Sequence, residues 1–185
     1  SWAPACGECA PCLAGRETAC LALRAAIRAG TMLDGTTGLE VDGGPVYRMT
    51  TVGALAEHVL VPAATALPIP ADVPLEQAAL LGCAALTGVG AVLTGNRVEP
   101  GASVLVVGAG GVGQFVVQGA RIAGAARIVA VDHFPGRREA ALALGAHEAF
   151  SPDEFAETDA FDVTFDAVGL AATSETALAA ARGGG

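Results

Sequence analysis

Apolar residues in this chain come in short blocks, and their arrangement changes near residue 103. From there on, short apolar segments that predict strands alternate with longer segments that predict helices. A run with no polar alternation indicates a strand that is buried on both faces, as in a parallel sheet with helices on each side. The pattern predicts strands at 103–107, 127–131 and 162–166 and helices at 112–123, 136–144 and 171–181.

The first hundred residues follow a different pattern. Residues 31–45 are dense in Gly, Asp and Thr and predict a loop, whereas the β-branched and aromatic residues of 46–61 predict one or two strands. A proline-rich extended connector follows, and Pro74 then favours a helix at 75–81, with a second helix at 85–93. We therefore predict one domain over residues 1–84. Residues 85–185 form the second, a doubly wound α/β domain whose three or four strands leave its sheet incomplete.

Charge and composition exclude several classes of partner. The chain has a net charge of −9 and no lysine, so nucleic acid is not expected to bind. Because no apolar run approaches 18 residues and no secretion signal is visible, we expect no membrane association and a cytoplasmic location. Ser1 and the terminal Arg182–Gly185 read as interior positions of a longer chain.

Four of the five cysteines lie close together, at Cys6, Cys9, Cys12 and Cys20. Four thiolates in one short loop are typical of a tetrahedral zinc site that leaves no position open for water, so the ion would be structural. Two disulfides are the alternative, which a cytosolic location and the strained spacing disfavour. A nucleic-acid-binding zinc module is disfavoured by the acidic charge.

A glycine-rich turn follows the predicted strand 103–107 directly. It has the pattern G-x-G-x-x-G: Gly108 would permit the tight turn, Gly110 the approach of a pyrophosphate, and Gly113 close packing of helix on strand. The N–H groups near Gly111 and Val112 would bind phosphate oxygens at the start of the next helix.

Asp132 ends the next strand, where an acid binds the ribose hydroxyls of a dinucleotide. Its negative charge favours NAD over NADP, whose 2′-phosphate it would repel. Arg137 and Arg138 leave NADP open, since either side chain could reach a phosphate, and Arg137 could equally be an exposed residue at a helix start. His133 receives no role. An S-adenosylmethionine enzyme could share the turn and the acid but would not explain the cysteines.

Together and in this order, the two motifs resemble the zinc-dependent medium-chain alcohol dehydrogenases. The resemblance covers the whole chain, about half of a typical family member, and includes the segments 56–62, 82–88 and 165–169. It implies that the first domain is part of a mainly β, GroES-like catalytic domain and that the second is the NAD-binding Rossmann domain. It also implies that Cys83 is the third ligand of a catalytic zinc, that Thr87 lies against the nicotinamide, and that Val168 lies near the adenosine.

The family's other two catalytic-zinc ligands and its proton relay precede the cysteine lobe, and no Cys or His precedes Cys6. Residues 1–185 alone are therefore expected to be inactive. His58 could replace a ligand, although a lone His in a strand is more often a packed or surface residue, and Cys83 taken alone would read as a buried apolar cysteine.

For the full-length protein the resemblance implies hydride transfer from a primary or secondary alcohol to NAD, with zinc lowering the pKa of the alcohol. Family members are usually homo-oligomers. The alternatives are a dehydrogenase of a formaldehyde–thiol adduct or of a polyol, and a non-catalytic protein that binds NAD and zinc.

Overall fold

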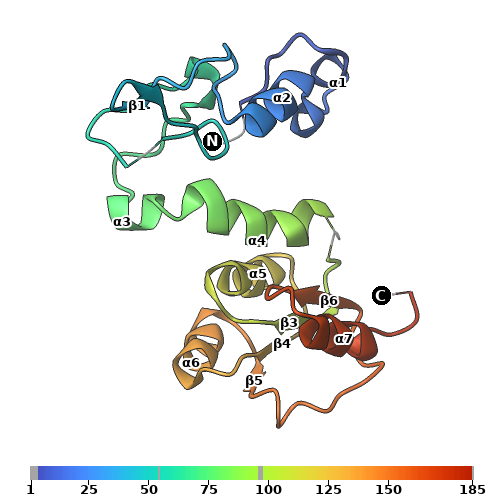
Figure 1. The fold of residues 1–185 in the computed structure, drawn as a ribbon. Helices are drawn as coiled ribbons and strands as arrows, with labels where there is room; N and C mark the ends of the chain where they lie inside the picture. Colours follow the sequence, from blue (N-terminus) through green and yellow to red (C-terminus); the bar gives the residue numbers. More distant parts are fainter. Residues whose placement is uncertain (1–3, 54, 96–97, 185) are drawn as a thin grey trace. The chain divides into compact units, whose positions relative to one another are not determined.

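A parallel sheet occupies the second half of the chain in the computed structural model, which describes residues 4–53, 55–95 and 98–184 (Figure 1). Its four strands among these residues are β3 (Ser103–Val107), β4 (Arg127–Val131), β5 (Glu148–Phe150) and β6 (Val163–Asp166), in the order β5-β4-β3-β6. The predictions for β3 and β4 are confirmed to the residue, and that for β6 to within one. Val107 pairs with both Val131 and Asp166, so the carboxyl ends of three strands meet at one edge.

Helices cover both faces of this sheet. Val104 and Val106 pack on one face beneath α5 (Gly111–Ile122) and α6 (Pro135–Leu144), while Leu105 and Val107 pack on the other with α7 (Ala171–Ala180). These strand side chains are 4% exposed or less, as expected for strands buried on both faces. The predicted doubly wound α/β architecture is confirmed over this region, and all three helices end within one residue of their predicted limits.

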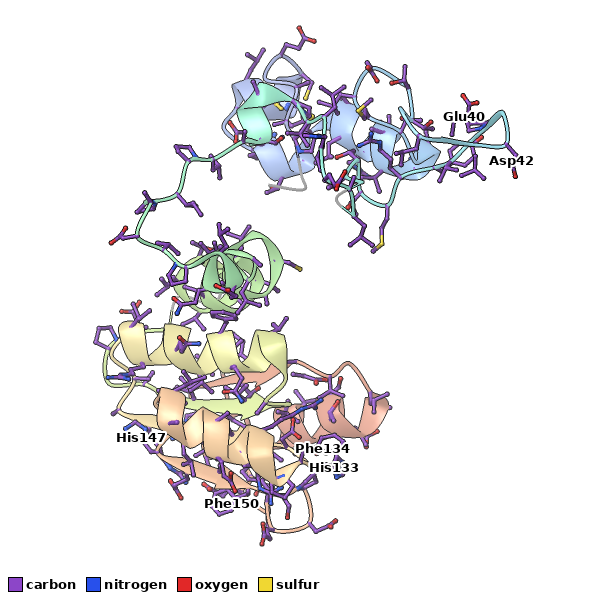
Figure 2. The ribbon with its side chains drawn as sticks, turned by 90° about the vertical axis from the view of Figure 1, so that its left-hand side faces the viewer. Glu40, Asp42, His133, Phe134, His147 and Phe150 are labelled. Atoms are coloured by element: carbon purple, nitrogen blue, oxygen red, sulfur yellow. The ribbon has the colours of Figure 1, made fainter. Side chains whose placement is uncertain are left out.

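The strand β5 was not predicted. Its three residues are only half-buried, and a segment this short carries no readable periodicity. It pairs with β4 and continues into a loop held by Arg127, which forms ion pairs with Glu148 and Glu157 at 2.8 and 2.7 Å. Figure 2 shows His147 and Phe150 at the two ends of this edge strand.

A long helical run precedes the sheet. It consists of α3 (Leu75–Ala78), the π-helical turn η3 (Leu81–Ala85), α4 (Leu86–Gly90) and a second π-helical turn, η4 (Ala91–Gly95). Over Leu75–Gly95 it is long and apolar enough to cross a membrane, with a mean hydropathy of 1.8. One such helix is weak evidence, because length and composition alone meet this test; 17% of the apolar stretch is buried, and α4 packs on α5. The expectation of no membrane association stays a prediction.

Because of this packing, the chain divides into compact units at Ser1–Pro74 and Leu75–Gly185. The division comes earlier than the predicted boundary between residues 84 and 85, since the whole helical run belongs with the sheet. The assignment of a catalytic and an NAD-binding domain to the two halves stays a prediction.

The first unit contains α1 (Ala10–Leu13), a 3-10 turn η1 (Glu17–Ala19), α2 (Leu21–Ala29), the antiparallel pair β1 (Glu40–Val41) and β2 (Gly44–Pro45), and a further 3-10 turn η2 (Ala63–Thr65). Glu40 and Asp42 lie exposed on the β1–β2 hairpin (Figure 2).

The predicted strands at 46–61 are wrong for the described residues. Thr50 and Thr51 have φ of 59° and 71°, which breaks an extended chain, and only the isolated bridge between Met49 and Val52 remains. Arg48 is buried there and donates hydrogen bonds to the carbonyls of Thr37 and Thr51. The loop predicted at 31–45 instead contains the hairpin. The mainly β character implied for the first domain stays a prediction.

Candidate metal centre and dinucleotide site

The four predicted zinc ligands converge in the first unit. Their sulfur atoms all lie within 4.8 Å of one another, and four of the separations are between 3.4 and 4.0 Å. Zinc at about 2.3 Å from each sulfur requires S···S distances of roughly 3.8 Å in a tetrahedron. The arrangement therefore fits a four-thiolate zinc ion. Local turns create it: Gly7 has φ of 80°, Pro11 lies in the first turn of α1, and Cys20 is the N-cap of α2.

The thiols of this cluster differ in pKa, because backbone N–H groups and burial act on them unequally. Sγ of Cys20 accepts hydrogen bonds from the N–H groups of Leu23 and Cys6, each at 3.4 Å, and these lower the pKa of Cys20 to about 6. A backbone hydrogen bond at Leu21 lowers the pKa of Cys9 in the same way. Burial instead raises the pKa of Cys12 to about 12. At neutral pH the metal-free lobe thus holds a thiolate at Cys20 and a protonated thiol at Cys12.

This inequality predicts how zinc binding depends on pH. Zinc takes thiolates, so uptake at pH 7 must release at least the Cys12 proton, and the dissociation constant should fall at least tenfold for each unit by which the pH rises. Below about pH 6 Cys20 is also protonated, and the dependence should steepen by another factor of about ten per unit. Competition with a chromophoric chelator between pH 5 and 8 measures both slopes. An affinity independent of pH between 7 and 8 would contradict the assignment of Cys12 as a ligand.

The glycine-rich turn connects β3 to α5 at the carboxyl edge of the sheet. Gly108 has φ of 90°, and a Cβ on Gly113 would lie 1.9 Å from the carbonyl oxygen of Gly108. A Cβ on Gly110 or Gly111 would meet nothing within 4 Å. The turn is therefore closely packed on its inner side and open on its outer side. The first N–H groups of α5 have no partner inside the helix, so they are available to an anion in that open space.

Asp132 at the end of β4 lies beside this turn and is 6% exposed. Its carboxylate accepts hydrogen bonds from the N–H of Ala109 at 2.9 Å and from the N–H of Phe134 at 2.8 Å. Arg137 approaches the same carboxylate at 3.5 Å, with its guanidinium 4.6 Å from the centre of the Phe134 ring. The structure thus brings together the predicted Gly108–Gly113 turn, Asp132 and Arg137.

Two further side chains, those of Gln114 and Arg138, brace the backbone around the turn. Gln114 donates from Nε2 to the carbonyls of Ala109 and Arg137, both at 2.9 Å, while its buried Oε1 has no hydrogen-bond partner among the described residues. Arg138 donates to the carbonyls of Asp132 and His133. His133 itself is exposed, next to Phe134 (Figure 2). Sequence reasoning missed Gln114, because a Gln in the first turns of a helix carries no distinctive signal.

The loop after β6 forms the other wall of the turn. A Cβ on Gly108 would lie 2.4 Å from a methyl carbon of Val168, so Val168 covers the turn directly. Asp166 holds this loop: it accepts the N–H groups of Val168 and Gly169 and the hydroxyls of Thr173 and Ser174. Its role was not predicted, although an acid at a strand end was the available signal.

Comparisons with known proteins agree on one family. A family model described as "Zinc-binding dehydrogenase" matches residues 111–185. Alcohol dehydrogenase 6 of Peromyscus maniculatus is 35% identical over 95% of this chain and 49% of its own length. An S-(hydroxymethyl)glutathione dehydrogenase of Escherichia coli is 39% identical over 81% of this chain and 41% of its own. The crystal structure of an alcohol dehydrogenase zinc-binding domain protein from Burkholderia ambifaria superposes with a TM-score of 0.86, at 34% identity, over 96% of this chain and 51% of that one.

The chain belongs to the zinc-dependent medium-chain alcohol dehydrogenase family. It spans about half the length of the curated relatives it matches. Membership implies zinc and NAD as cofactors. The described residues fit both groups, since the four thiols have the spacing zinc requires and the outer side of the turn leaves room for a pyrophosphate.

The residues assigned to catalysis by family resemblance lie elsewhere in the second unit. Cys83 is an exposed free thiol in η3, and Thr87 is exposed in α4. Cys83 is therefore not the buried apolar cysteine that its type alone would suggest. His58 is exposed in the first unit. The four-cysteine lobe is the only convergent group of three or more potential metal ligands among residues 4–53, 55–95 and 98–184. A catalytic role for Cys83 and Thr87 stays a prediction.

Proposed function

We propose that the full-length protein is a zinc-dependent alcohol dehydrogenase that oxidises a primary or secondary alcohol with NAD. The observation that carries this proposal is the glycine-rich turn, open on its outer side and bordered by Asp132, in a chain of this family. The reaction converts an alcohol and NAD⁺ into an aldehyde or ketone, NADH and a proton.

Within this proposal each group of residues has its own task. Gly110, Gly111 and the first N–H groups of α5 hold the pyrophosphate, and Asp132 accepts the ribose hydroxyls through its remaining lone pairs. Val168 packs against the adenosine side, and Arg137 closes the pocket from α6. Thr87 packs against the nicotinamide, and Cys83 supplies one ligand of the catalytic metal. The lobe of Cys6, Cys9, Cys12 and Cys20 holds a second, structural ion.

When bound, zinc at Cys83 supplies a Lewis acid that lowers the pKa of the alcohol, and the nicotinamide accepts the hydride. The protein's contribution is to hold both at fixed positions and to exclude other reactions. We place the enzyme in the cytoplasm, as a homo-oligomer acting on a small-molecule alcohol or aldehyde.

A second candidate substrate is the thiol adduct of formaldehyde, supported by the 39% identity with the Escherichia coli S-(hydroxymethyl)glutathione dehydrogenase. The full-length protein should hold two zinc ions per chain and reduce NAD, followed at 340 nm, with one class of substrate: simple alcohols, polyols or S-(hydroxymethyl)glutathione. One zinc per chain, NAD binding and no turnover with any class would instead indicate a non-catalytic NAD-binding protein. NAD reduction by residues 1–185 alone would contradict the ligand assignment.

The charge of Asp132 makes a separate prediction about cofactor choice. Replacing Asp132 with Asn removes the charge that repels a 2′-phosphate but keeps one oxygen for the N–H of Ala109. We expect NAD affinity to fall about tenfold and the preference for NAD over NADP to fall by a similar factor, which corresponds to roughly 1.4 kcal/mol for each change. Quenching of intrinsic fluorescence by each dinucleotide gives the two dissociation constants.

Asp162→Asn is the matched control for this variant. Asp162 also accepts a backbone N–H, that of Ser103 at 2.7 Å, but at the amino end of the sheet. The Asp162→Asn variant should have a lower melting temperature but an unchanged ratio of the dissociation constants for NAD and NADP. An unchanged ratio in Asp132→Asn would show that Asp132 does not select the cofactor.

A further inference from the structure

Gly88 lies where α4 crosses α5, and the two helices touch there through their backbones. Gly88 is buried, and a Cβ added to it would lie 2.6 Å from the carbonyl oxygen of Val112 and 2.8 Å from the backbone nitrogen of Val116. Both are main-chain atoms, so no change of rotamer relieves the overlap. Any side chain at position 88 must therefore move one helix away from the other.

A second glycine extends this contact from the opposite helix. A Cβ on Gly119 of α5 would lie 3.2 Å from Cα of Val89 and 3.1 Å from a methyl carbon of Val92, which is fully buried. The two helices are therefore in close contact at two points, at Gly88 of α4 and at Gly119 of α5. Helices normally pack 8–10 Å apart, and the side chains at the contact set the distance. Here the absence of a side chain sets it.

The position of this contact links the two halves of the proposed active site. Val112 belongs to the first turn of α5, whose N–H groups face the proposed pyrophosphate position. Thr87 precedes Gly88 directly, and Cys83 lies in the same helical run, which continues through η3 and α4 without a break. A shift of α4 away from α5 would therefore move Cys83 and Thr87 relative to the bound dinucleotide.

We propose that Gly88 is a positioning residue that sets the distance between Cys83 and Thr87 on one helix and the dinucleotide-binding turn of the other. This role rests on the proposed dehydrogenase function. Favourable carbon contacts lie at about 3.5–4.0 Å, so an added methyl group falls short by roughly 1 Å. A displacement of about 1 Å away from the chemistry is enough to slow a hydride transfer about 100-fold, because the reacting atoms must approach in one geometry.

The test compares Gly88→Ala with Gly90→Ala in the full-length zinc-loaded enzyme. Gly90 lies in the same helix, but a Cβ there would meet only the hydroxyl of Thr94 at 3.9 Å. For Gly88→Ala we expect kcat to fall 10- to 100-fold and the isotope effect with a C1-deuterated alcohol to rise. The dissociation constant for NAD should change less than threefold and the zinc content should not change. Gly90→Ala should keep kcat within twofold.

A structural readout keeps the test independent of turnover. Crystal structures of the wild-type and Gly88→Ala proteins should show the Cα atoms of Cys83 and Val112 further apart in the variant by at least several tenths of an ångström. An unchanged distance overturns the proposal, as does a kcat within twofold of wild type or a loss explained wholly by lost NAD or zinc. A wild-type protein that reduces no NAD with any substrate would refute the proposed function. The distance between the Cα atoms of Cys83 and Val112 would still decide whether Gly88 sets the spacing of the two helices.

If Gly88→Ala does not fold, Gly119→Ala gives the same information through a milder contact. Its overlap partly involves the Val92 side chain, so the double variant Val92→Ala, Gly119→Ala should recover at least half of the kcat lost in Gly119→Ala. The Val92→Ala single variant measures the effect of the cavity alone. If the double variant recovers none of the kcat that Gly119→Ala loses, the spacing of the helices does not control the rate.

Discussion

Serine in place of Cys20 is expected to remove one zinc ion per chain and to destabilise the first unit severely. Cys20 is completely buried, its sulfur accepts two backbone N–H groups, and it lies 3.6 Å from the sulfur of Cys6. A serine hydroxyl is shorter, is not ionised at neutral pH and is a poor zinc ligand. In small lobes of this kind the free energy of zinc binding, about 10 kcal/mol or more, is the free energy of folding.

Zinc content by mass spectrometry and thermal unfolding measure this effect in the full-length protein. Loss of roughly 4 kcal/mol would lower the melting temperature by about 10 °C. Cys83→Ser is the matched comparison, because the same substitution there touches an exposed thiol. It should also lose one zinc ion, together with activity, but should melt within a few degrees of wild type. Equal zinc content and equal melting in Cys20→Ser and wild type would refute a structural zinc in the lobe.

Alanine at Gly113 is the second change with a large expected effect. The added Cβ would lie 1.9 Å from the carbonyl oxygen of Gly108 and 2.9 Å from its carbonyl carbon. These atoms belong to the turn between β3 and α5, and β3 is buried at the centre of the sheet. The clash can be relieved only by lifting the helix from the strand. We expect a destabilisation of more than about 3 kcal/mol, in the range of severe core overpacking.

The Gly110→Ala variant tests NAD binding separately from the packing of helix on strand at Gly113. A Cβ there meets nothing within 4 Å, and φ of −74° suits alanine, so the protein should fold and melt as wild type does. NAD affinity should nevertheless fall about tenfold or more, since the methyl group occupies the space proposed for the pyrophosphate. Chemical unfolding and NAD titration of both variants provide the measurements. A stable Gly113→Ala protein, or a Gly110→Ala protein that binds NAD normally, would contradict the corresponding role.

The sequence predicted the sheet well because burial on both faces leaves an unambiguous pattern. The strands β3 and β4 are apolar and buried from their second residue on, and any other location would expose these side chains. The four-cysteine lobe was equally predictable, since its ligands lie within fifteen positions of one another and short-range turns alone bring them together. The glycine-rich turn was identified because it directly follows a predicted strand, a position in which each of its three glycines has a defined structural role.

Other features depend on contacts that no local pattern records. The β-branched residues of 46–61 indicated strands, but Arg48 is buried against the carbonyls of Thr37 and Thr51, and the chain turns at Thr50. Asp132 was expected as a ribose ligand, but its carboxylate also accepts a hydrogen bond from the N–H of Ala109. This hydrogen bond across the turn depends on the pairing of β3 with β4.

By itself, then, the sequence determined which segments are buried strands, which thiols gather, and where a dinucleotide turn begins, because each of these follows from residues near one another in the chain. Only the tertiary structure decided that the helical run 75–95 belongs with the sheet and that Gly88 meets the backbone of Val112. Such a contact joins residues 24 positions apart, and its closeness depends on two helix surfaces fitting together, which hydrophobic periodicity along one helix does not encode.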